Sequence, residues 1–280
     1  MILTSIVLYP VKSCRGIEVD RARVEKRGLA LDRRWMVADE RGRFVSQREE
    51  PRLSLVDVSI EGDVIHLSSA GAGQARVPIT TDDGARRQVG VWGRHTGAIV
   101  HDEASHWMSA FLGRDVSVVH LSDTIDSPMS SSRAKPGDEV SFADGYPLLV
   151  ASEESLADLG ARIEARGSAA VPMVRFRPNV VVRGAPAWDE DAWATLTIGS
   201  VTLRAPKPCE RCVMTTIDPA TARLGLEPLR TLATFRRRDH GVWFGVNLVP
   251  DTLGEIQIGD AVRITGRTEP PAFDVLSDRA

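Results

Sequence analysis

Short runs of alternating hydrophobic and polar residues fill the first 100 positions of the chain. Turn-forming sequences such as Arg41-Gly42 and Glu61-Gly62-Asp63 separate these runs. Alternation with a period of two predicts strands that bury one face, and their close spacing is typical of an antiparallel meander or barrel. The strands expected here cover residues 2–9, 17–26, 34–40, 53–60 and 63–69.

Helical spacing follows further along the chain. Ala104, Trp107 and Phe111 would share one face of a helix, and Ser152 is a suitable N-cap for the acidic residues that follow it. Helices are therefore predicted at 103–112, 153–165 and 228–236. Further strands are expected at 173–182, 194–204, 242–250 and 261–265.

The order of these elements predicts a mainly β, α+β fold rather than a βαβ chain, and no dinucleotide-binding or P-loop motif is present. Residues 121–136 are rich in Ser, Asp and Pro, which predicts a long loop that acts as a domain boundary or an active-site flap. We expect two interlocked β-barrel-like units with a few helices and no large parallel sheet. Their predicted limits are 1–120 and 121–270, followed by a tail at 271–280.

Composition narrows the class of protein. The chain has 280 residues, of which 42% are hydrophobic and 26% charged, and its net charge is −3. These values describe a soluble globular protein with no general attraction for nucleic acid or an acidic membrane. No apolar run reaches the roughly 18 residues that a membrane span needs, and the N-terminus lacks the features of a signal peptide. Three cysteines are too few for a disulfide framework, so we expect a reduced, cytoplasmic protein.

The sequence KPCERC carries the most informative chemistry. Cys209 and Cys212 form a C-x-x-C pair with Lys207 and Arg211 beside them. A structural zinc site needs four ligands, but the third cysteine, Cys14, lies far away in the sequence and no suitable histidine pair follows. A thioredoxin-like dithiol would need a βαβ context. The remaining interpretation is a thiolate, favoured by nearby cations, that binds a soft metal. Cys14, or even Cys209, fits the role of a small buried hydrophobe better than Cys212 does.

Seven segments together resemble proteins with MOSC domains. RCVMTTIDPAT at 211–221 is similar to the cofactor-ligand motif of the mitochondrial amidoxime-reducing components and their bacterial relatives. The other six occur in the family's order: YPVKSC at 9–14, DRRW at 32–35, QREEPRL at 47–53, SEESL at 152–156, FRPN at 176–179 and FGVN at 244–247. The resemblance extends from residue 3 to about residue 266. Ala222 departs from it, because the family often has glycine there, and this should alter the turn only slightly.

The resemblance implies a MOSC N-terminal β-barrel domain at 1–120 and a MOSC domain at 121–270, with molybdopterin held between them. Cys212 matches the residue that binds molybdenum. A phosphate dianion favours guanidinium forks and an ammonium group, and the helix after Ser152 could add backbone donors. The candidate cofactor-binding residues are Lys12, Ser13, Arg33, Ser152, Arg177, Asn179 and Arg211. Judged from the sequence alone, Arg33, Arg48 and Arg177 also suit ordinary surface positions. If the resemblance holds, Lys12, Ser13, Arg33 and Arg177 should converge on one pocket.

The resemblance also implies a molybdenum-cofactor oxidoreductase that reduces N-hydroxylated compounds, such as amidoximes and N-hydroxylated bases, in N-reductive detoxification. The metal would cycle between Mo(IV) and Mo(VI). No cysteine follows Cys212, so we expect no cysteine-ligated iron–sulfur cluster in this chain. The electrons should come from a separate ferredoxin, flavodoxin or cytochrome b5-like protein with its reductase. Asp218 is a candidate catalytic residue for proton handling or for shaping the pocket, and it equally suits an Asp-Pro turn.

Two other functions remain open. The chain could carry molybdenum cofactor without reductase activity, or it could handle sulfur as a persulfide on Cys212. A pyridoxal phosphate enzyme is disfavoured, because only four lysines are available and none lies in a suitable segment. In the leading hypothesis, Cys212 lies at the floor of a cavity and Arg211 or nearby amides favour its thiolate. Cys209 would not bind the metal, because a second protein thiolate would fill the position that the substrate oxygen needs.

Overall fold

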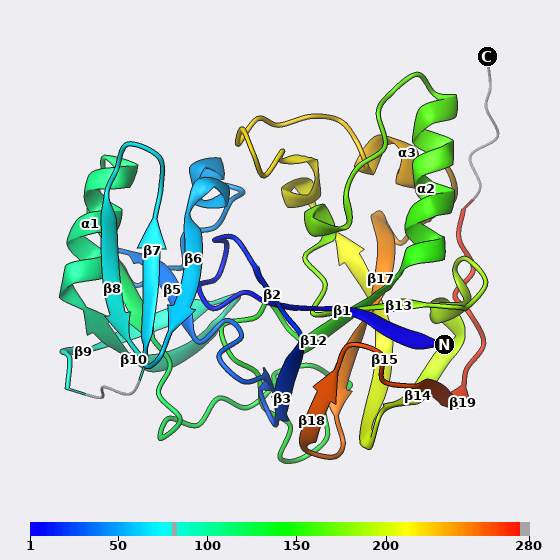
Figure 1. Ribbon diagram of the computed structural model, residues 1–280, viewed down its shortest axis with the longest axis horizontal. Helices are drawn as coiled ribbons and strands as arrows, with labels where there is room; N and C mark the ends of the chain where they lie inside the picture. Colours follow the sequence, from blue (N-terminus) through cyan, green and yellow to red (C-terminus); the bar gives the residue numbers. More distant parts are fainter. Residues whose placement is uncertain (80–82, 275–280) are drawn as a thin grey trace.

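The computed structural model describes residues 1–79 and 83–274. Figure 1 shows two lobes side by side, the first built mostly from the N-terminal part of the chain and the second mostly from the rest. Strands dominate both lobes, and α-helices pack on the outside of each. The prediction of a mainly β, α+β protein is therefore confirmed.

Two antiparallel sheets form the first lobe. Its strands are β5 (Trp35–Asp39), β6 (Asp57–Glu61), β7 (Val64–Ser68), β8 (Gln74–Pro78), β9 (Arg86–Val91), β10 (Arg94–His101) and β11 (Val116–His120). One sheet has the order β5-β11-β10-β9, and the other is a β6-β7-β8 meander. Helix α1 (Asp102–Leu112) packs against β8 and β11, burying Ala104 and Met108 in the core of the lobe. The helix ends at Gly113, whose φ of 65° is the left-handed conformation common after a helix.

A nine-stranded sheet forms the second lobe. Its strands are β1 (Ile2–Leu8), β2 (Ile17–Val19), β12 (Leu148–Ser152), β13 (Val180–Arg183), β14 (Trp193–Ile198), β15 (Val201–Arg211), β16 (Arg237–Arg238), β17 (Gly241–Pro250) and β19 (Val262–Arg267). Their order is β19-β14-β15-β17-β12-β13-β1-β2, with β16 on β17. The Val262 amide donates to the Met1 carbonyl at 3.0 Å, so the two ends of the sheet approach each other. Beside it lies a small sheet of β3 (Arg21–Glu25), β4 (Gly28–Leu29) and β18 (Gly254–Gln257).

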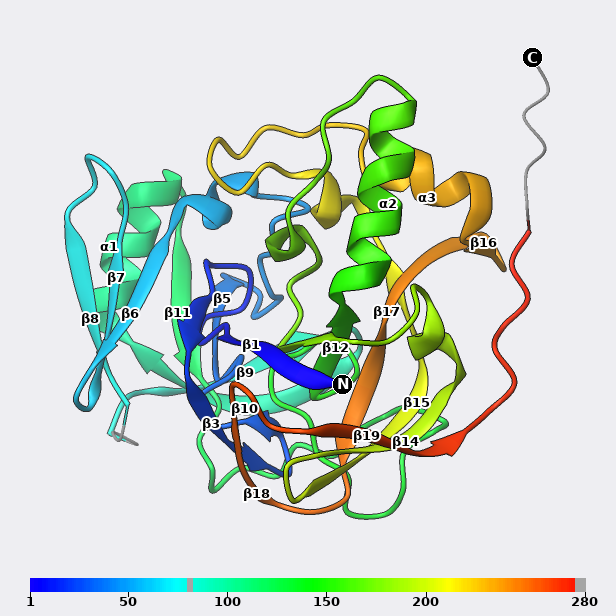
Figure 2. The same cartoon turned by 45° about the vertical axis from the view of Figure 1, so that its right-hand side comes forward.

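One βαβ unit is present although the sequence predicted a chain without such alternation. Strands β12 and β13 are parallel neighbours, and helix α2 (Glu153–Ala165) connects them. All other pairs of strands within the sheets are antiparallel in the described residues, so no large parallel sheet forms. Figure 2 shows α2 beside α3 (Leu229–Phe235) on one side of the sheet. The three predicted helices are confirmed to within one residue at each end.

Prolines account for two strand predictions that are wrong in part. The expected strand 173–182 begins instead as a 3-10 helix, η2 (Met173–Phe176), and only β13 is extended. Pro172 directly precedes η2, and Arg177 directly follows it with a left-handed φ of 54°. Neither conformation continues a regular strand, so the predicted strand is interrupted here. Similarly, η1 (Pro51–Leu55) replaces the start of the expected strand 53–60.

Strand β15 carries the C-x-x-C motif to the site. The sequence predicted a strand that ends at 204, but β15 continues through Arg211. Its register against β17 shifts between Arg204 and Lys207 and again between Pro208 and Glu210. Prolines lack the amide hydrogen of a regular ladder, which explains irregular pairing here. The strand ends immediately before Cys212, which is the N-cap residue of η4 (Val213–Thr216).

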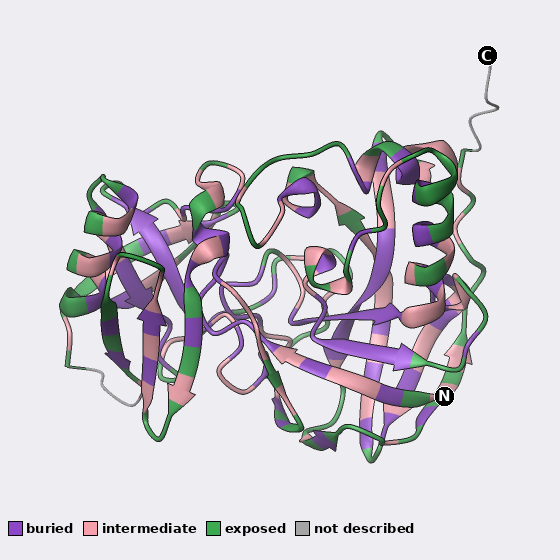
Figure 3. Ribbon diagram, turned by 45° about the horizontal axis from the view of Figure 1, so that its top comes forward, coloured by how far each residue is buried: buried purple, intermediate pink, exposed green. Residues whose placement is uncertain are grey.

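Buried positions run through the strands of both lobes, while exposed positions gather on loops and on the outer faces of the helices (Figure 3). The largest core cluster joins β1, β12, β14, β15 and β17. This packing holds the ends of β12, β15 and β17 around the site. Among the described residues, no helix is both long and apolar enough to cross a membrane.

Candidate functional site

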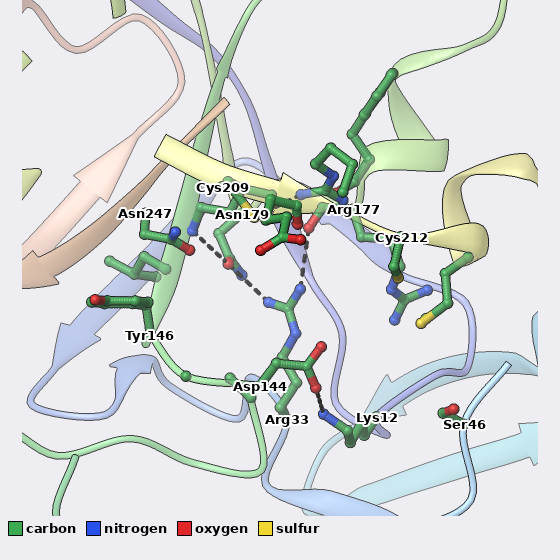
Figure 4. A pocket seen from close by; sticks show the side chains of 18 of the residues that line it. Lys12, Arg33, Ser46, Asp144, Tyr146, Arg177, Asn179, Cys209, Cys212 and Asn247 are labelled. Atoms are coloured by element: carbon green, nitrogen blue, oxygen red, sulfur yellow. Dashed lines mark hydrogen bonds and ion pairs between the residues drawn. The ribbon is translucent and has the colours of Figure 1, made fainter. Parts of the chain in front are cut away.

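A cavity of about 550 Å³ is lined by residues of both lobes. Its charged side chains are mainly cationic: Lys12, Arg33, Arg48, Arg175, Arg177, Lys207 and Arg211. The lining also includes the carboxylates Asp144 and Glu210. Such an excess of positive charge favours an anionic ligand. Figure 4 shows Lys12, Arg33, Arg177 and Cys212 around this cavity, and Ser13 also lines it, so the predicted convergence is observed.

Arg33 and Asn179 link the two lobes at the cavity. Arg33 Nη1 donates to Asn179 Oδ1 at 2.8 Å and to Asp32 Oδ2 at 2.5 Å, and Nη2 donates to the Arg177 carbonyl at 3.1 Å. Asn179 Oδ1 also accepts from the Leu149 amide at 3.2 Å, while its Nδ2 donates to the Val7 carbonyl at 3.2 Å. These contacts fix the Arg33 guanidinium in one orientation.

Arg177 is half-buried and forms no ion pair with a carboxylate among residues 1–79 and 83–274. Its Nη1 donates to the Cys14 carbonyl at 2.8 Å. Burial, aided by the nearby charge of Arg33, lowers the pKa of Arg177 to about 10. A partly buried cation without a paired counter-ion is costly, so an anion bound in the cavity would stabilise it.

The backbone is strained at three residues of the cavity. Ser13, Arg33 and Arg177 have φ values of 72°, 49° and 54°, in the left-handed region that non-glycine residues rarely adopt. Such conformations persist only where the surrounding structure maintains them, and they are common at ligand sites. The Ser13 hydroxyl is buried and has no hydrogen-bond partner among the described residues. It is therefore available to a ligand in the cavity.

Lys12 is held by a carboxylate that the sequence analysis did not identify. Lys12 Nζ donates to the Phe142 carbonyl at 2.8 Å and forms an ion pair with Asp144. Burial lowers the pKa of Lys12, and Asp144 opposes that shift. Although burial alone would raise the pKa of Asp144, the charges of Lys12 and Arg48 hold it well below its usual range. Asp144 Oδ1 also accepts from Trp92 Nε1 at 3.0 Å.

Both cysteines of the C-x-x-C motif line the cavity. Arg211 Nη1 donates to Cys209 Sγ at 2.9 Å, and its Nη2 donates to the Phe176 carbonyl at 2.7 Å. The expectation that Arg211 favours the Cys212 thiolate directly is therefore wrong, because its guanidinium points to Cys209. Cys14 is fully buried, and burial raises its pKa to about 12, which agrees with a small hydrophobic role.

Family models match both parts of the chain. The MOSC N-terminal beta barrel domain matches residues 1–115, and the MOSC domain matches residues 137–263. The chain is 34% identical to the mitochondrial amidoxime-reducing component 1 of Homo sapiens, over 93% of this chain and 82% of the relative. It is 33% identical to mitochondrial amidoxime reducing component 2 of Bos taurus, over 93% and 82% of the two chains.

The chain belongs to the MOSC family of amidoxime-reducing components. Molybdenum cofactor is the group that this membership implies, and the residues present fit it. The unpartnered Ser13 hydroxyl and the half-buried Arg177 suit a phosphate group, because Ser13 has no hydrogen-bond partner and Arg177 has no ion-paired carboxylate among the described residues. A free thiol, Cys212, borders the same cavity and is a suitable ligand for a soft metal.

Two predicted residues of this MOSC protein do not line the cavity. Ser152 is buried, and its hydroxyl accepts from the Ser155 amide at 3.4 Å at the N-terminus of α2. Its position supports the predicted helix cap and not cofactor binding. The Asp218 carboxylate accepts from the Ala220 and Thr221 amides at 2.9 and 3.0 Å, and these bonds lower its pKa. Asp218 therefore stabilises its turn, and it does not itself line the cavity, although it pairs at 3.3 Å with Arg175, which does.

The cavity of this MOSC protein contains several residues that the sequence analysis left out or treated as ordinary. Glu210 lies within the C-x-x-C motif itself, so its position two residues before Cys212 is visible in the sequence. Asp144 and Trp92 carry no comparable signal, because each follows a plain loop or hairpin pattern. Trp92 lies at the turn between β9 and β10 with a φ of 50° and is 56% exposed.

Proposed function

We propose that the chain is a molybdenum-cofactor oxidoreductase that reduces N-hydroxylated compounds, R–NH–OH, to the amines or amidines R–NH₂. The observation that carries this proposal is the meeting of a free thiol, Cys212, with the half-buried Arg177 and the unpartnered Ser13 hydroxyl in one cavity. The relatives' printed name, amidoxime-reducing component, supports N-hydroxylated substrates.

Arg33, Arg177, Lys12 and Ser13 would hold the phosphate and pterin, and Cys212 would bind the metal. Two guanidinium groups and one ammonium group match a phosphate that bears two negative charges. When bound, the cofactor supplies the two electrons and takes up the substrate oxygen. The strained backbone at Ser13, Arg33 and Arg177 keeps the donors aimed into the cavity before the cofactor binds.

The overall reaction, R–NH–OH + 2 H⁺ + 2 e⁻ → R–NH₂ + H₂O, consumes two protons, so the cavity needs a group that delivers them. Asp144 is engaged by Lys12, Arg48 and Trp92. The Glu210 carboxylate forms no hydrogen bond or ion pair with any described residue, and it lies two positions before Cys212. We assign proton delivery to Glu210 in place of Asp218.

The electrons would come from a separate ferredoxin, flavodoxin or cytochrome b5-like protein with its reductase. A cytoplasmic location belongs to the same proposal, since all three cysteines are free thiols, as a reduced compartment would keep them.

The test is to purify the full chain from a host that makes molybdenum cofactor, and to measure molybdenum, pterin fluorescence and benzamidoxime reduction by a reduced viologen dye. We expect about one molybdenum per chain and turnover to benzamidine, with both lost in Cys212→Ala. Molybdenum without turnover would indicate a carrier instead. A persulfide on Cys212 without molybdenum would indicate a sulfur-handling protein.

A further inference from the structure

Tyr9 contacts both arginines of the cofactor cavity although it does not line the cavity itself. It directly follows β1 and is fully buried. The Arg33 Cζ atom lies 4.4 Å from the centre of the Tyr9 ring, and the Arg177 Cζ atom lies 4.1 Å from it. Both distances are within the range of a cation–π interaction. One aromatic ring thus contacts two like charges that come from distant parts of the chain.

We propose that Tyr9 is a positioning residue whose ring holds Arg33 and Arg177 at the anion site of the cavity. The identification of that anion as the cofactor phosphate rests on the proposed function. The arrangement itself requires only that the cavity binds an anion.

The Tyr9 ring can hold the two arginines without competing with a bound phosphate, as a carboxylate in its place would. Arg33 and Arg177 repel each other, and the charge of Arg33 adds to burial in lowering the pKa of Arg177. A carboxylate between them would relieve the repulsion but would also compete with a bound phosphate for the same donors. An aromatic face attracts a cation through its quadrupole and does not occupy its N–H donors. Arg33 also forms an ion pair with Asp32, whereas the Tyr9 ring holds Arg177 without neutralising it.

The surroundings fix the ring in this place. The Tyr9 amide donates to Asp32 Oδ1 at 2.8 Å, and the Arg33 amide donates to the Tyr9 carbonyl at 2.9 Å. A Cβ atom at Gly16 would lie 2.6 Å from Tyr9 Cε1, so only glycine leaves enough space for the ring. These contacts bring the YPVKS and DRRW segments together beside the cavity.

The ring, and not the hydroxyl, carries the proposed role. The Tyr9 hydroxyl is buried and has no hydrogen-bond partner among the described residues. Burial, the larger influence, raises the pKa of this hydroxyl, although Arg177 and Arg33 oppose the shift. Tyr9→Phe should therefore preserve the positioning of the arginines, whereas a non-aromatic side chain should not.

The experiment measures the affinity of the cofactor-free full chain for inorganic phosphate by calorimetric titration. The variants are Tyr9→Leu, Tyr9→Met and Tyr9→Phe, and Met serves because it fills a similar volume if Leu prevents folding. Phe111→Leu is the control, because it removes an aromatic ring that stacks on Trp107 at 5.5 Å, outside the cavity. Circular dichroism checks that each variant is folded.

We expect Tyr9→Leu and Tyr9→Met to bind phosphate roughly tenfold more weakly, the loss that corresponds to a buried cation–π contact. Tyr9→Phe should restore the affinity, and Phe111→Leu should keep it. A folded Tyr9→Met protein with wild-type phosphate affinity would overturn the proposal, and so would a wild-type chain that does not bind phosphate. A merely structural role would lower thermal stability in Tyr9→Met and Phe111→Leu alike and leave phosphate affinity unchanged.

Molybdenum content after expression in a cofactor-competent host separates this inference from the proposed function. A wild-type chain that binds phosphate in a Tyr9-dependent way but contains no molybdenum would support the positioning role and contradict the proposed function. Equal molybdenum contents in the wild-type chain and in Tyr9→Met would support the proposed function and contradict the positioning role.

Discussion

The Arg211 guanidinium donates a hydrogen bond to the Cys209 sulfur at 2.9 Å, although Cys212 is its immediate neighbour in the chain. A strand alternates the directions of its side chains, so positions 209 and 211 of β15 lie on one face. Cys212, the first residue beyond the strand, is thereby left without a cationic partner from Arg211. The two cysteines consequently have different environments within the same cavity.

This difference leads to the prediction that only one of the two cysteines binds molybdenum. Cys212→Ala should lose both molybdenum and amidoxime reduction, the latter by more than about a hundredfold, since even a change outside the ligand set costs up to that factor. Cys209→Ala should keep the metal, because the pterin dithiolene already supplies two sulfur ligands. Metal analysis of both variants decides the matter. An equal loss of metal in the two would argue for a bidentate C-x-x-C site.

Arg177 is expected to contribute to anion binding without stabilising the cofactor-free chain. Arg177→Met removes a half-buried cation that has no carboxylate partner among the described residues, so the free energy of unfolding of the cofactor-free chain should stay unchanged or rise by about 1 kcal/mol. Molybdenum content should fall at the same time. Urea denaturation and metal analysis on the same preparations test this pair of effects, and a marked loss of stability would contradict it.

Asp144 should control how phosphate binding depends on pH. Asp144 opposes the lowering of the Lys12 pKa, so Asp144→Asn should lower that pKa further. Lys12 would then lose its proton at a lower pH, and phosphate affinity would decline earlier as the pH rises. At pH values below the pKa of Lys12, the variant should bind phosphate more tightly, because the competing carboxylate is gone. Calorimetric titrations with phosphate between pH 6 and 9 test both the low-pH and the high-pH expectation. Asp218→Asn is the control, because Asp218 does not line the cavity.

Glu210→Gln tests the assignment of proton delivery. We expect kcat for benzamidoxime to fall by roughly a hundredfold, the lower end of general acid–base contributions, while molybdenum content is unchanged. Asp218→Asn should leave kcat near the wild-type value, since the Asp218 carboxylate is engaged with backbone amides of its own turn. If the two variants behaved in the opposite way, proton handling would return to Asp218.

Ser152→Ala should act on stability alone. Loss of a helix N-cap costs about 1 kcal/mol in the free energy of unfolding, and the Ser152 hydroxyl caps α2. Because Ser152 does not line the cavity, molybdenum content and the KM for benzamidoxime should not change. If the Ser152→Ala protein were fully folded but contained less molybdenum, the sequence-based assignment of Ser152 to the cofactor would be right.

Local patterns in the sequence were sufficient for much of the fold. The face formed by Ala104 and Met108 and the Ser152 cap predicted α1 and α2, because helix spacing and capping depend on residues a few positions apart. The role of Cys212 as a metal ligand stays a prediction, because the neighbouring Arg211 points to Cys209 instead. Strand β12 escaped prediction because it is buried on both faces and therefore shows no alternation.

The sequence by itself thus determined the residue types of the site and the family to which its motifs belong. Only the tertiary structure decided which of those residues meet. Lys12 contacts Asp144, 132 positions away, and Arg211 selects Cys209 rather than its neighbour Cys212. Such contacts depend on how sheets from two lobes pack and on the direction in which each strand turns its side chains. Because these are properties of the whole fold, no local pattern of residues could have revealed them.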